Sequence, residues 1–436
     1  MGSEWAETTL GEVLELKRGY DLPKRLRRPG DVPVISSAGN SDDHEVAKVE
    51  GPGVVTGRYG TIGEVYYCER DFWPLNTTLY VRDFKGNDRK FVYYFLKTIN
   101  YLEYSDKAAV PGVNRNHLHM AEVRIPKGVA DQKSIAHILG TLDDKIELNR
   151  RMNETLESMA RALFKSWFVD FDPVIDNALA AGNPIPEPLS QRAQTRRDLG
   201  TKRKPLPKNI QKLFPDAFVF DEQTGWIPED WAVSLMPDVT EFREGPGILS
   251  KDFHEQGVPL IRLAGLKNGV SLLDGCDYLD PAKVEKKWSH FKLQKGDILL
   301  SSSASLGRVA EVDSEAVGSV PYTGIIGFRP VEGRSARRYL RHYLASIYFQ
   351  QQIEMLGVGS VLKHFGPTHL KKIRMLVPSV AIQERFADLI GPNDNACIER
   401  LKASNNLAKL RDTLLPKLLS GELRIPDAEK LVAGSL

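Results

Sequence analysis

The chain contains one long internal repeat, found by sliding the sequence along itself at an offset of about 230–250 residues. Six landmarks recur in the same order in both copies. They are a first tryptophan (Trp5 and Trp231), an apolar run (32–35 and 258–261), a strand, turn and strand (54–65 and 298–309), an aromatic helical stretch (91–99 and 339–351), an apolar element ending in proline (123–126 and 373–378), and a helix led by Gln132 or Gln383. The offset is too long for a solenoid, so we predict two copies of one large α/β unit. The alternative is that two unrelated α+β domains share generic strand and helix patterns.

A long amphipathic helix follows each copy of the repeat. After Gln132, apolar residues recur in alternating steps of four and three, and no Gly or Pro interrupts residues 141–172. This spacing is typical of a coiled-coil seam, and one helix cannot bury such a stripe alone. The second copy provides the partner helix. We expect the two helices to meet along a seam formed by Ile135, Leu139, Leu142, Ile146, Leu156, Leu163, Trp167, Ile390, Cys397, Leu401, Leu407, Leu414 and Leu418.

Two asparagines, Asn149 and Asn153, lie near this seam. A buried asparagine often fixes the register of paired helices at a cost in stability. The alternative is that both face solvent, with Met152 in the seam instead. The spacing alone leaves both arrangements open.

Prolines divide the second helix. Because proline cannot continue a helix from the preceding turn, Gly391-Pro392 predicts a short helix before it and a long helix that begins near Asn393. Pro416 should kink or loosen the last turn, and Gly421 should lie at the helix stop.

The segment between the two halves, residues 173–228, has a different composition. Prolines and basic residues cluster in it, which indicates a connector without much fixed structure. The basic run is expected to be a solvated linker, with contact to DNA phosphates as the alternative. Its members are Arg192, Arg196, Arg197, Lys202, Arg203, Lys204, Lys208 and Lys212.

Composition narrows the classes of function. The chain has 59 basic and 57 acidic residues, for a formal net charge of +2, so any surface that binds nucleic acid must be local. Cys68, Cys276 and Cys397 lie far apart without zinc spacing, which fits a reducing compartment. The sequence starts without a signal pattern and has no run of about 18 apolar residues. We therefore expect a cytoplasmic protein without a membrane span.

Motifs for catalysis are missing. An adenine methyltransferase should carry an Asn-Pro-Pro-aromatic motif and a glycine-rich cofactor loop, and residues 76–79 (NTTL) are not such a motif. No P-loop lysine motif is present. Residues 57–63 (GRYGTIG) resemble a phosphate cradle, but no helix follows them. His117 and His119 lack a carboxylate or cysteine partner at metal-ligand spacing. We predict neither a catalytic site nor a metal site.

Several phrases of the sequence resemble the specificity subunits of type I restriction-modification systems. The resemblance covers almost the whole chain and is most specific in the first long helix. The phrases are LGEV (10–13) with KRG (17–19), GRYGTIG (57–63), LGTLDDKIELN (139–149), LFKSWFVDFDPV (163–174), LFP (213–215), GWIP (225–228) and LLPKLLSGEL (414–423). Two departures are the interruption at Gly391-Pro392 and residues 301–305 (SSSAS), which replace the glycine-rich turn of the first copy.

This resemblance implies an α+β fold with two tandem α/β target-recognition domains, related by a pseudo-twofold axis and separated by two long antiparallel coiled-coil helices. The implied divisions are recognition domain 1 (1–130), spacer helix 1 (131–172), a linker (173–228), recognition domain 2 (229–380), spacer helix 2 (381–420) and a tail (421–436).

The resemblance also implies a function. Each recognition domain would bind one half of a bipartite duplex DNA target, and the helices would set the spacer between the halves. The implied partners are double-stranded DNA, two methyltransferase subunits, and endonuclease/translocase subunits. The chain itself would need no cofactor, because S-adenosylmethionine, ATP and Mg²⁺ are expected on the partner subunits.

By analogy with the family, the turn at 57–63 presents Arg58 and Tyr59 near DNA. The alternative is a tight turn that needs only positive φ. Arg58 would bond a guanine in the major groove or hold a phosphate. Further polar residues on predicted loops are candidates for DNA contact, with ordinary surface exposure as the alternative: Lys17, Arg18, Asn114, Arg115, Asn116 and His117 in the first copy, and Arg262, Ser302, Ser303, Ser305, Arg308, Tyr322, Thr323, Lys363 and His364 in the second.

Two other functions fit the same patterns. One is an enzyme, a methyltransferase or nuclease fusion whose motifs are unrecognised, which a cofactor-binding titration would reveal. The other is a protein scaffold whose helices dimerise, which would lack the salt-dependent DNA binding expected from phosphate contacts.

Overall fold

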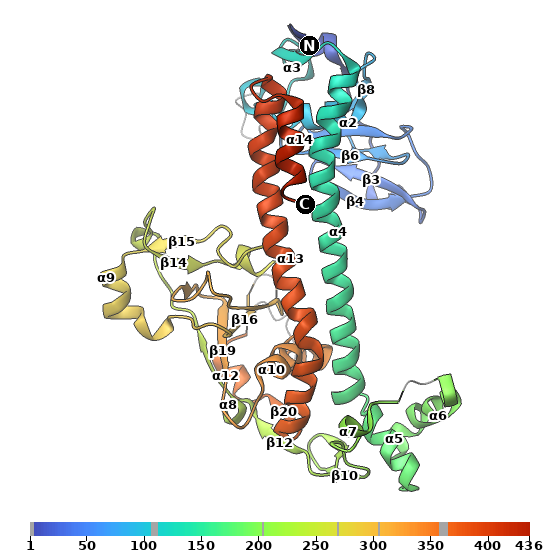
Figure 1. Ribbon diagram of the computed structural model, residues 1–436, viewed down its shortest axis with the longest axis vertical. Helices are drawn as coiled ribbons and strands as arrows, with labels where there is room; N and C mark the ends of the chain where they lie inside the picture. Colours follow the sequence, from blue (N-terminus) through green and yellow to red (C-terminus); the bar gives the residue numbers. More distant parts are fainter. Residues whose placement is uncertain (1–3, 106–111, 203–204, 268–269, 304–305, 357–364) are drawn as a thin grey trace. The chain divides into compact units, whose positions relative to one another are not determined.

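The structure is a computed structural model that describes the 436 residues except 1–3, 106–111, 203–204, 268–269, 304–305 and 357–364 (Figure 1). It divides into two units, residues 1–148 with 406–436 and residues 149–405. The division falls within two long helices, α4 (Val129–Phe168) and α13 (Val380–Ser420), so each unit contains one copy of the repeat and part of both helices.

The first unit contains three small sheets. Strand β1 pairs antiparallel with β9, a four-stranded sheet has the order β2-β8-β5-β6, and a three-stranded sheet has the order β4-β3-β7, with β3 and β7 parallel. The strands are β1 (Trp5–Thr9), β2 (Glu15–Arg18), β3 (Val32–Ser36), β4 (Gly39–His44), β5 (Gly53–Gly57), β6 (Val65–Cys68), β7 (Trp73–Pro74), β8 (Thr78–Asp83) and β9 (Glu122–Pro126). The other helices of this unit are α1 (Leu10–Val13), α2 (Arg89–Leu96), α3 (Arg115–His119), α14 (Ile425–Ala433) and the 3-10 turns η1 (Lys24–Leu26) and η2 (Tyr101–Tyr104).

The second unit repeats this plan. Strand β12 pairs antiparallel with β20, and the two sheets have the orders β13-β19-β16-β17 and β15-β14-β18, with β14 and β18 parallel. The strands are β12 (Ala232–Leu235), β13 (Thr240–Glu244), β14 (Val258–Ile261), β15 (Asp277–Leu279), β16 (Ile298–Ser301), β17 (Val309–Glu311), β18 (Val320–Pro321), β19 (Ile325–Pro330) and β20 (Arg374–Val377). Its helices are α8 (Met236–Val239), α9 (Pro281–Lys283), α10 (Arg337–Leu344), α11 (Ile347–Leu356), α12 (Pro367–Leu370) and the short turns η5 (Ser250–Asp252), η6 (Leu263–Leu266), η7 (Val284–Trp288) and η8 (Ser289–Phe291).

The matching sheet orders and pairings confirm the duplication. A buried glutamine also fixes the start of each long helix in the same way. Gln132 is 1% exposed, and its amide donates to the carbonyl of a proline just before the helix and accepts from the backbone N–H of Asp88, the N-cap of α2. Gln383 is 0% exposed and makes the corresponding bonds to a proline carbonyl and to the N–H of Ala336, the N-cap of α10. The glutamine that leads each predicted helix therefore joins it to its own repeat.

Helices α4 and α13, teal and red in Figure 1, run antiparallel within each unit. In the first unit, the carboxylate of Asp143 on α4 accepts from Arg411 on α13 at 2.7 Å. In the second, Asn149 Nδ2 donates to Ser404 Oγ at 3.1 Å. Within the second unit, Asn153 bonds the carbonyl of Cys397, so the number of the partner on α13 falls as the residue number rises along α4, which defines the antiparallel direction there.

Both asparagines near the seam are directed at the partner helix. Asn149 is 5% exposed, and Asn153 donates to the carbonyl of Cys397 at 3.1 Å. Met152, the alternative seam residue, is 39% exposed. Of the two arrangements, the structure shows a buried Asn149 and a half-buried Asn153 in the seam, with the methionine outside.

The predicted seam residues divide between the two cores. Ile135, Leu139, Leu142, Leu407, Leu414 and Leu418 are buried in the core of the first unit, with Ile146 half-buried against it. Trp167 and Ile390 are buried in the core of the second unit, and Leu163 is half-buried against it. Leu156, Cys397 and Leu401 are half-buried and belong to neither cluster. In the second unit the helices meet through aromatic rings, with Phe164 and Phe386 centred 5.7 Å apart.

The predicted split of the second helix is wrong, because α13 continues through Gly391-Pro392. Residues on both sides of the pair are fixed by tertiary contacts. Ile390 is 2% exposed in the core, and the carboxylate of Asp394 lies 3.0 Å from Arg341. These contacts outweigh the backbone hydrogen bond that the proline lacks. The predicted stop is confirmed, since α13 ends at Ser420.

Two expectations about the connector are also wrong. The first helix ends at Phe168 rather than at Asp172, because Phe171 adopts a left-handed conformation with φ 56° and is buried at 9% exposure. The described part of the connector has regular structure instead of lacking it. Its elements are α5 (Asp172–Ala181), η3 (Glu187–Leu189), α6 (Ser190–Leu199), η4 (Gly200–Lys202), α7 (Lys208–Gln211), β10 (Phe218–Asp221) and β11 (Gly225–Pro228).

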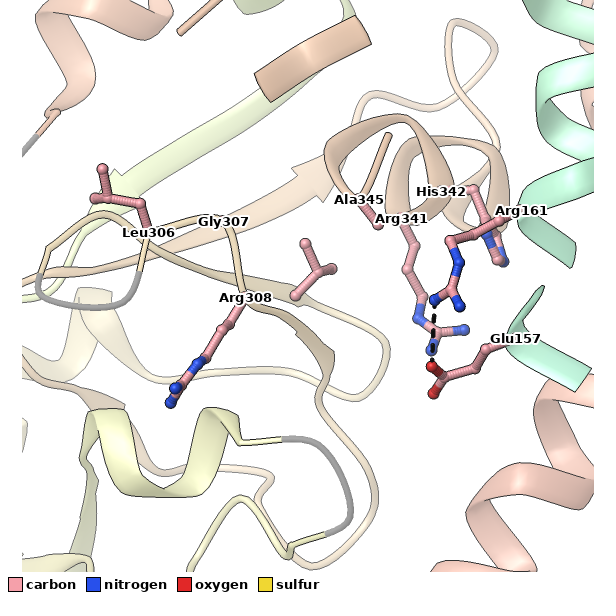
Figure 2. Close-up of a pocket in the computed structure, with 9 residues that line it drawn as sticks. Glu157, Arg161, Leu306, Gly307, Arg308, Arg341, His342 and Ala345 are labelled. Atoms are coloured by element: carbon pink, nitrogen blue, oxygen red, sulfur yellow. Dashed lines mark ion pairs between the residues drawn. The ribbon is translucent and has the colours of Figure 1, made fainter. Parts of the chain in front are cut away.

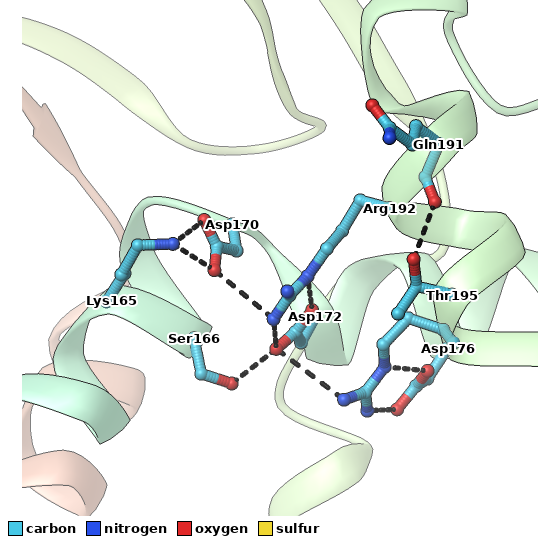
Figure 3. Close-up of polar contacts among 9 residues, drawn as sticks. Lys165, Ser166, Asp170, Asp172, Asp176, Gln191, Arg192 and Thr195 are labelled. Atoms are coloured by element: carbon cyan, nitrogen blue, oxygen red, sulfur yellow. Dashed lines mark hydrogen bonds and ion pairs between the residues drawn. The ribbon is translucent and has the colours of Figure 1, made fainter. Parts of the chain in front are cut away.

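An ion-pair network holds α5 and α6 together (Figure 3). Arg192 bonds Asp172 through two nitrogens at 2.7 Å, and Arg196 pairs with Asp176. Asp172 is 3% exposed and also accepts from Ser166 Oγ at 2.7 Å. Two members of the basic run therefore neutralise aspartates of this chain, which neither of the considered roles, solvated linker or phosphate contact, anticipated.

Candidate nucleic-acid interface

In the first repeat, candidate residues from three segments meet where strands of the four-stranded sheet end. Arg18 ends β2 opposite Leu79 of β8, and β5 ends one step further along the same strand. The backbone N–H groups of Arg58 and Tyr59 both donate to the carbonyl of Thr77. Lys17 and Arg18 therefore lie at the same end of the sheet as the turn that follows β5.

That turn is tight, as one of the two sequence interpretations held. Gly60 and Gly63 have φ of 77° and 84°, and a Cβ on Gly57 would lie 1.9 Å from the carbonyl oxygen of Thr61. The turn also displays an arginine on an aromatic ring, with the Arg58 guanidinium carbon 4.5 Å from the ring centroid of Tyr59. The turn is therefore tight and also carries the stacked Arg58 and Tyr59 side chains. Their contact with DNA stays a prediction.

A third segment joins this cluster. Tyr59 forms a β-bridge with Gly112, and the N–H of Val113 donates to the carbonyl of Arg58 at 3.0 Å. Asn114 then caps α3 by accepting from the N–H of Asn116. The side chains of Arg115, Asn116 and His117 are exposed. These candidates are thus brought beside the Arg58 turn, although they are far from it in sequence.

His119 has a structural role. Its Nε2 accepts from the backbone N–H of Leu16 at 2.9 Å, and burial, with the nearby charge of Arg115, lowers its pKa. Among the described residues no group of three or more His, Cys, Asp or Glu could hold a metal ion.

In the second repeat, the most constrained candidate is Arg262, which follows β14. Its guanidinium carbon lies 4.0 Å from the ring centroid of Tyr322 and 5.4 Å from that of Phe253. Its Nη1 lies 3.1 Å from the carboxylate of Asp277. The sequence pattern singled out Arg262 and Tyr322 but missed Phe253 and Asp277, because no local spacing marks residues that approach from separate loops.

The residue that follows β16 in the second repeat is held like the one that follows β5 in the first. The N–H of Ser302 donates to the carbonyl of Gly324, as the N–H of Arg58 does to Thr77. Ser302 is 0% exposed, whereas Ser303 is half-buried and Thr323 is exposed. The end of the sheet that corresponds to the Arg58 turn therefore holds Arg262, Ser302, Ser303, Tyr322 and Thr323. Ser305, Lys363 and His364 lie outside the described residues.

Arg308 lies beside the end of β16, where its backbone N–H donates to Ser301 Oγ at 2.9 Å. It lines a cavity of about 220 Å³ together with Arg161, Arg341 and His342 (Figure 2). The charges there are largely paired, since Arg161 lies 3.5 Å from Glu157 and Arg341 lies 3.0 Å from Asp394. Figure 2 shows the Arg308 side chain directed away from Arg341, so the cavity does not gather its arginines around one point.

Comparisons with known proteins agree with the duplicated plan. A family model described as the type I restriction modification DNA specificity domain matches residues 2–158 and 228–410. The chain is 27% identical over 342 residues to the type I restriction enzyme HindI specificity subunit of Haemophilus influenzae, covering 73% of this chain and 72% of that protein. It is 25% identical over 369 residues to the MjaIX specificity subunit of Methanocaldococcus jannaschii, covering 81% and 74%.

Solved structures support the same fold. The crystal structure of a type I restriction-modification S subunit from M. genitalium matches with a TM-score of 0.55, covering 96% of each chain at 17% identity. Among the described residues, the structure has no helix with the length and apolar character needed to cross a membrane.

Proposed function

The chain belongs to the type I restriction modification DNA specificity family, and we propose that it is the subunit that selects the DNA target of such a system. The observation that carries the proposal is the paired architecture. Two copies of one α/β domain each present polar and basic side chains at the same edge of a corresponding sheet. A protein built this way suits a target with two separate halves.

Each domain would bind one half of a bipartite duplex. Phosphate contacts would supply most of the affinity, and contacts to base edges would supply the selectivity. The two repeats differ at this position, with the half-buried Arg58 on the first turn and the fully buried Ser302 at the corresponding place in the second. The two halves of the target are therefore expected to differ in sequence.

The helices α4 and α13 would hold the two domains at a fixed separation and provide the docking surface for two methyltransferase subunits. The chain would act without catalysis of its own in the cytoplasm. S-adenosylmethionine would bind to the methyltransferase partners, and ATP and Mg²⁺ to the endonuclease/translocase subunits.

The test is a methylation assay with purified components. The chain together with its methyltransferase partner should transfer methyl groups to one split DNA sequence, which sequencing of the methylated host genome would identify. The chain alone should transfer none. Methylation by the lone chain would overturn its assignment as a recognition subunit, and methylation by the partner pair without sequence preference would refute target selection.

A protein scaffold is the second function to separate. Because phosphate contacts release counterions, the affinity of a DNA-binding chain should fall steeply as salt rises. A scaffold would show no DNA binding at any salt concentration.

A further inference from the structure

We propose that Arg262 reads a guanine in the half of the target bound by the second repeat. This inference rests on the proposed function and adds to it the residue and the base it recognises. Two aromatic rings and one carboxylate hold the guanidinium group of Arg262.

Aromatic and acidic contacts fix Arg262 in place. The rings of Tyr322 and Phe253 lie 4.0 and 5.4 Å from its guanidinium carbon, and both pack against the buried core formed around β14, β15 and β18. Asp277, which begins β15, lies 3.1 Å from Nη1. A planar guanidinium held by rings and a carboxylate loses little further freedom when it binds. Such preorganisation suits a contact that must discriminate between bases.

The remaining donors of Arg262 are available for a ligand. The side chain is 32% exposed, and no nitrogen of its guanidinium group has a hydrogen-bond acceptor within the described part of the chain apart from the Asp277 contact. Arginine carries five N–H donors in a rigid fork. Guanine is the base that presents two acceptors, N7 and O6, on its major-groove edge, and a bidentate arginine is its commonest partner.

Arg243 of the same unit shows what distinguishes Arg262. Its guanidinium also lies over an aromatic ring, 5.6 Å from that of Phe291. However, its Nη1 donates to the backbone carbonyl of His290 at 2.6 Å. A guanidinium donor of Arg243 is therefore bonded to its own chain. The guanidinium of Arg262 is held in place, but among the described residues its N–H donors make no comparable bond to a backbone carbonyl.

The two repeats place this kind of arginine on different segments. In the first repeat, Arg58 is stacked on Tyr59 after β5. The position after β16 that corresponds to Arg58 is Ser302, which is 0% exposed. In the second repeat, the stacked arginine instead follows β14. A shared scaffold thus carries its arginine at a different place in each domain, as expected if the two halves of the target place their guanines differently.

The experiment measures dissociation constants of the full complex with its methyltransferase partner for duplexes that carry the target or single base-pair changes. Arg262→Lys keeps the positive charge but lacks the bidentate fork. It should lose discrimination at one G·C pair of one half by about 5- to 150-fold, while discrimination in the other half stays unchanged. Arg243→Ala is the matched control and should leave both halves unchanged.

Three outcomes would overturn the inference. Equal weakening for all duplexes, with discrimination between them unchanged, would identify a phosphate contact instead. Unchanged discrimination in Arg262→Lys would show that the residue reads nothing. Loss of discrimination at an A·T pair would assign a different base. If the unmodified complex itself selects no split sequence, the proposed function fails, which is a separate result from failure of Arg262.

Discussion

Asp172 shows how one buried charge organises a segment that the sequence presents as a linker. The residue is 3% exposed, and Arg192, Arg196 and Ser166 surround its carboxylate. A buried ion pair contributes little net stability, but removing one partner leaves the other charges uncompensated. The network therefore determines that α5 and α6 stay together more than it determines overall stability.

Asp172→Asn should destabilise the second unit by about 1–3 kcal/mol, because Arg192 loses its two-nitrogen pairing with a buried carboxylate, while Arg196 keeps its pairing with Asp176. Urea unfolding would measure the loss, and hydrogen exchange should show α5 and α6 opening first. Asp198→Asn is the control, since Asp198 is exposed on α6 and, among the described residues, accepts a hydrogen bond from Gln194 alone. Equal stability of the two variants would contradict the structural role of the network.

His119 leads to a prediction about pH. Its ring must be neutral at Nε2 to accept from the N–H of Leu16, and burial with Arg115 nearby lowers its pKa below the ordinary value of about 6.5. Protonation is therefore easier in the unfolded chain, so its contribution to stability is present above pH 6.5 and is lost as the pH falls below it. The urea midpoint should fall more between pH 7.5 and 5.5 in the unmodified protein than in His119→Gln. Parallel pH profiles in both proteins would rule out this role.

At the scale of elements, α13 shows that local preference can be overridden. Gly391-Pro392 is a helix-breaking pair by sequence, yet contacts on both sides keep the helix continuous. Gly391 is also close to Arg338, since a Cβ there would lie 3.0 Å from Nη1. The glycine leaves room for the guanidinium, whereas the exposed Pro392 only removes a hydrogen bond.

The two residues should therefore respond to alanine by different amounts. Pro392→Ala restores an intrahelical N–H donor and should raise the free energy of unfolding by about 1–3 kcal/mol. Gly391→Ala should give less than the gain of about 1 kcal/mol expected for a glycine in a helix, because Arg338 must move. Thermal and urea unfolding would compare them. A larger gain from Gly391→Ala than from Pro392→Ala would contradict this packing.

At the scale of the whole molecule, the proposed function makes the paired helices determine the spacer of the target. The seam is interrupted at its centre by asparagines, with Asn149 bonded to Ser404 and Asn153 to the carbonyl of Cys397. These polar contacts fix which residues face each other, because a shift along the seam would leave buried amides unpaired.

Insertion of seven residues after Leu148 in α4 and before Asn406 in α13 keeps the seam in phase and lengthens both helices by about 10.5 Å. The preferred spacer should then grow by about three base pairs, at 3.4 Å each. Methylation of a duplex library with varied spacers would measure it. Lengthening only α4 is the control and should abolish site-specific methylation, and an unchanged spacer in the double insertion would reject the ruler role.

The sequence by itself determined what is written in periodic or repeated patterns. The offset between the two copies predicted two similar α/β domains, and the steps of four and three predicted the paired helices. It also marked Arg58, Tyr59 and Arg262 as polar residues on loops. Each of these signals is local or repeated, so it can be seen without knowing which segments meet.

Tertiary structure alone decided the features that depend on distant residues. The helix continues through Pro392 because of contacts to Arg341 and the core, and the connector is ordered because Arg192 reaches Asp172. Arg262 is fixed by three side chains that come from separate segments of the chain. Such contacts are worth more than local propensity, and no spacing in the sequence records them, because folding alone brings the partners together.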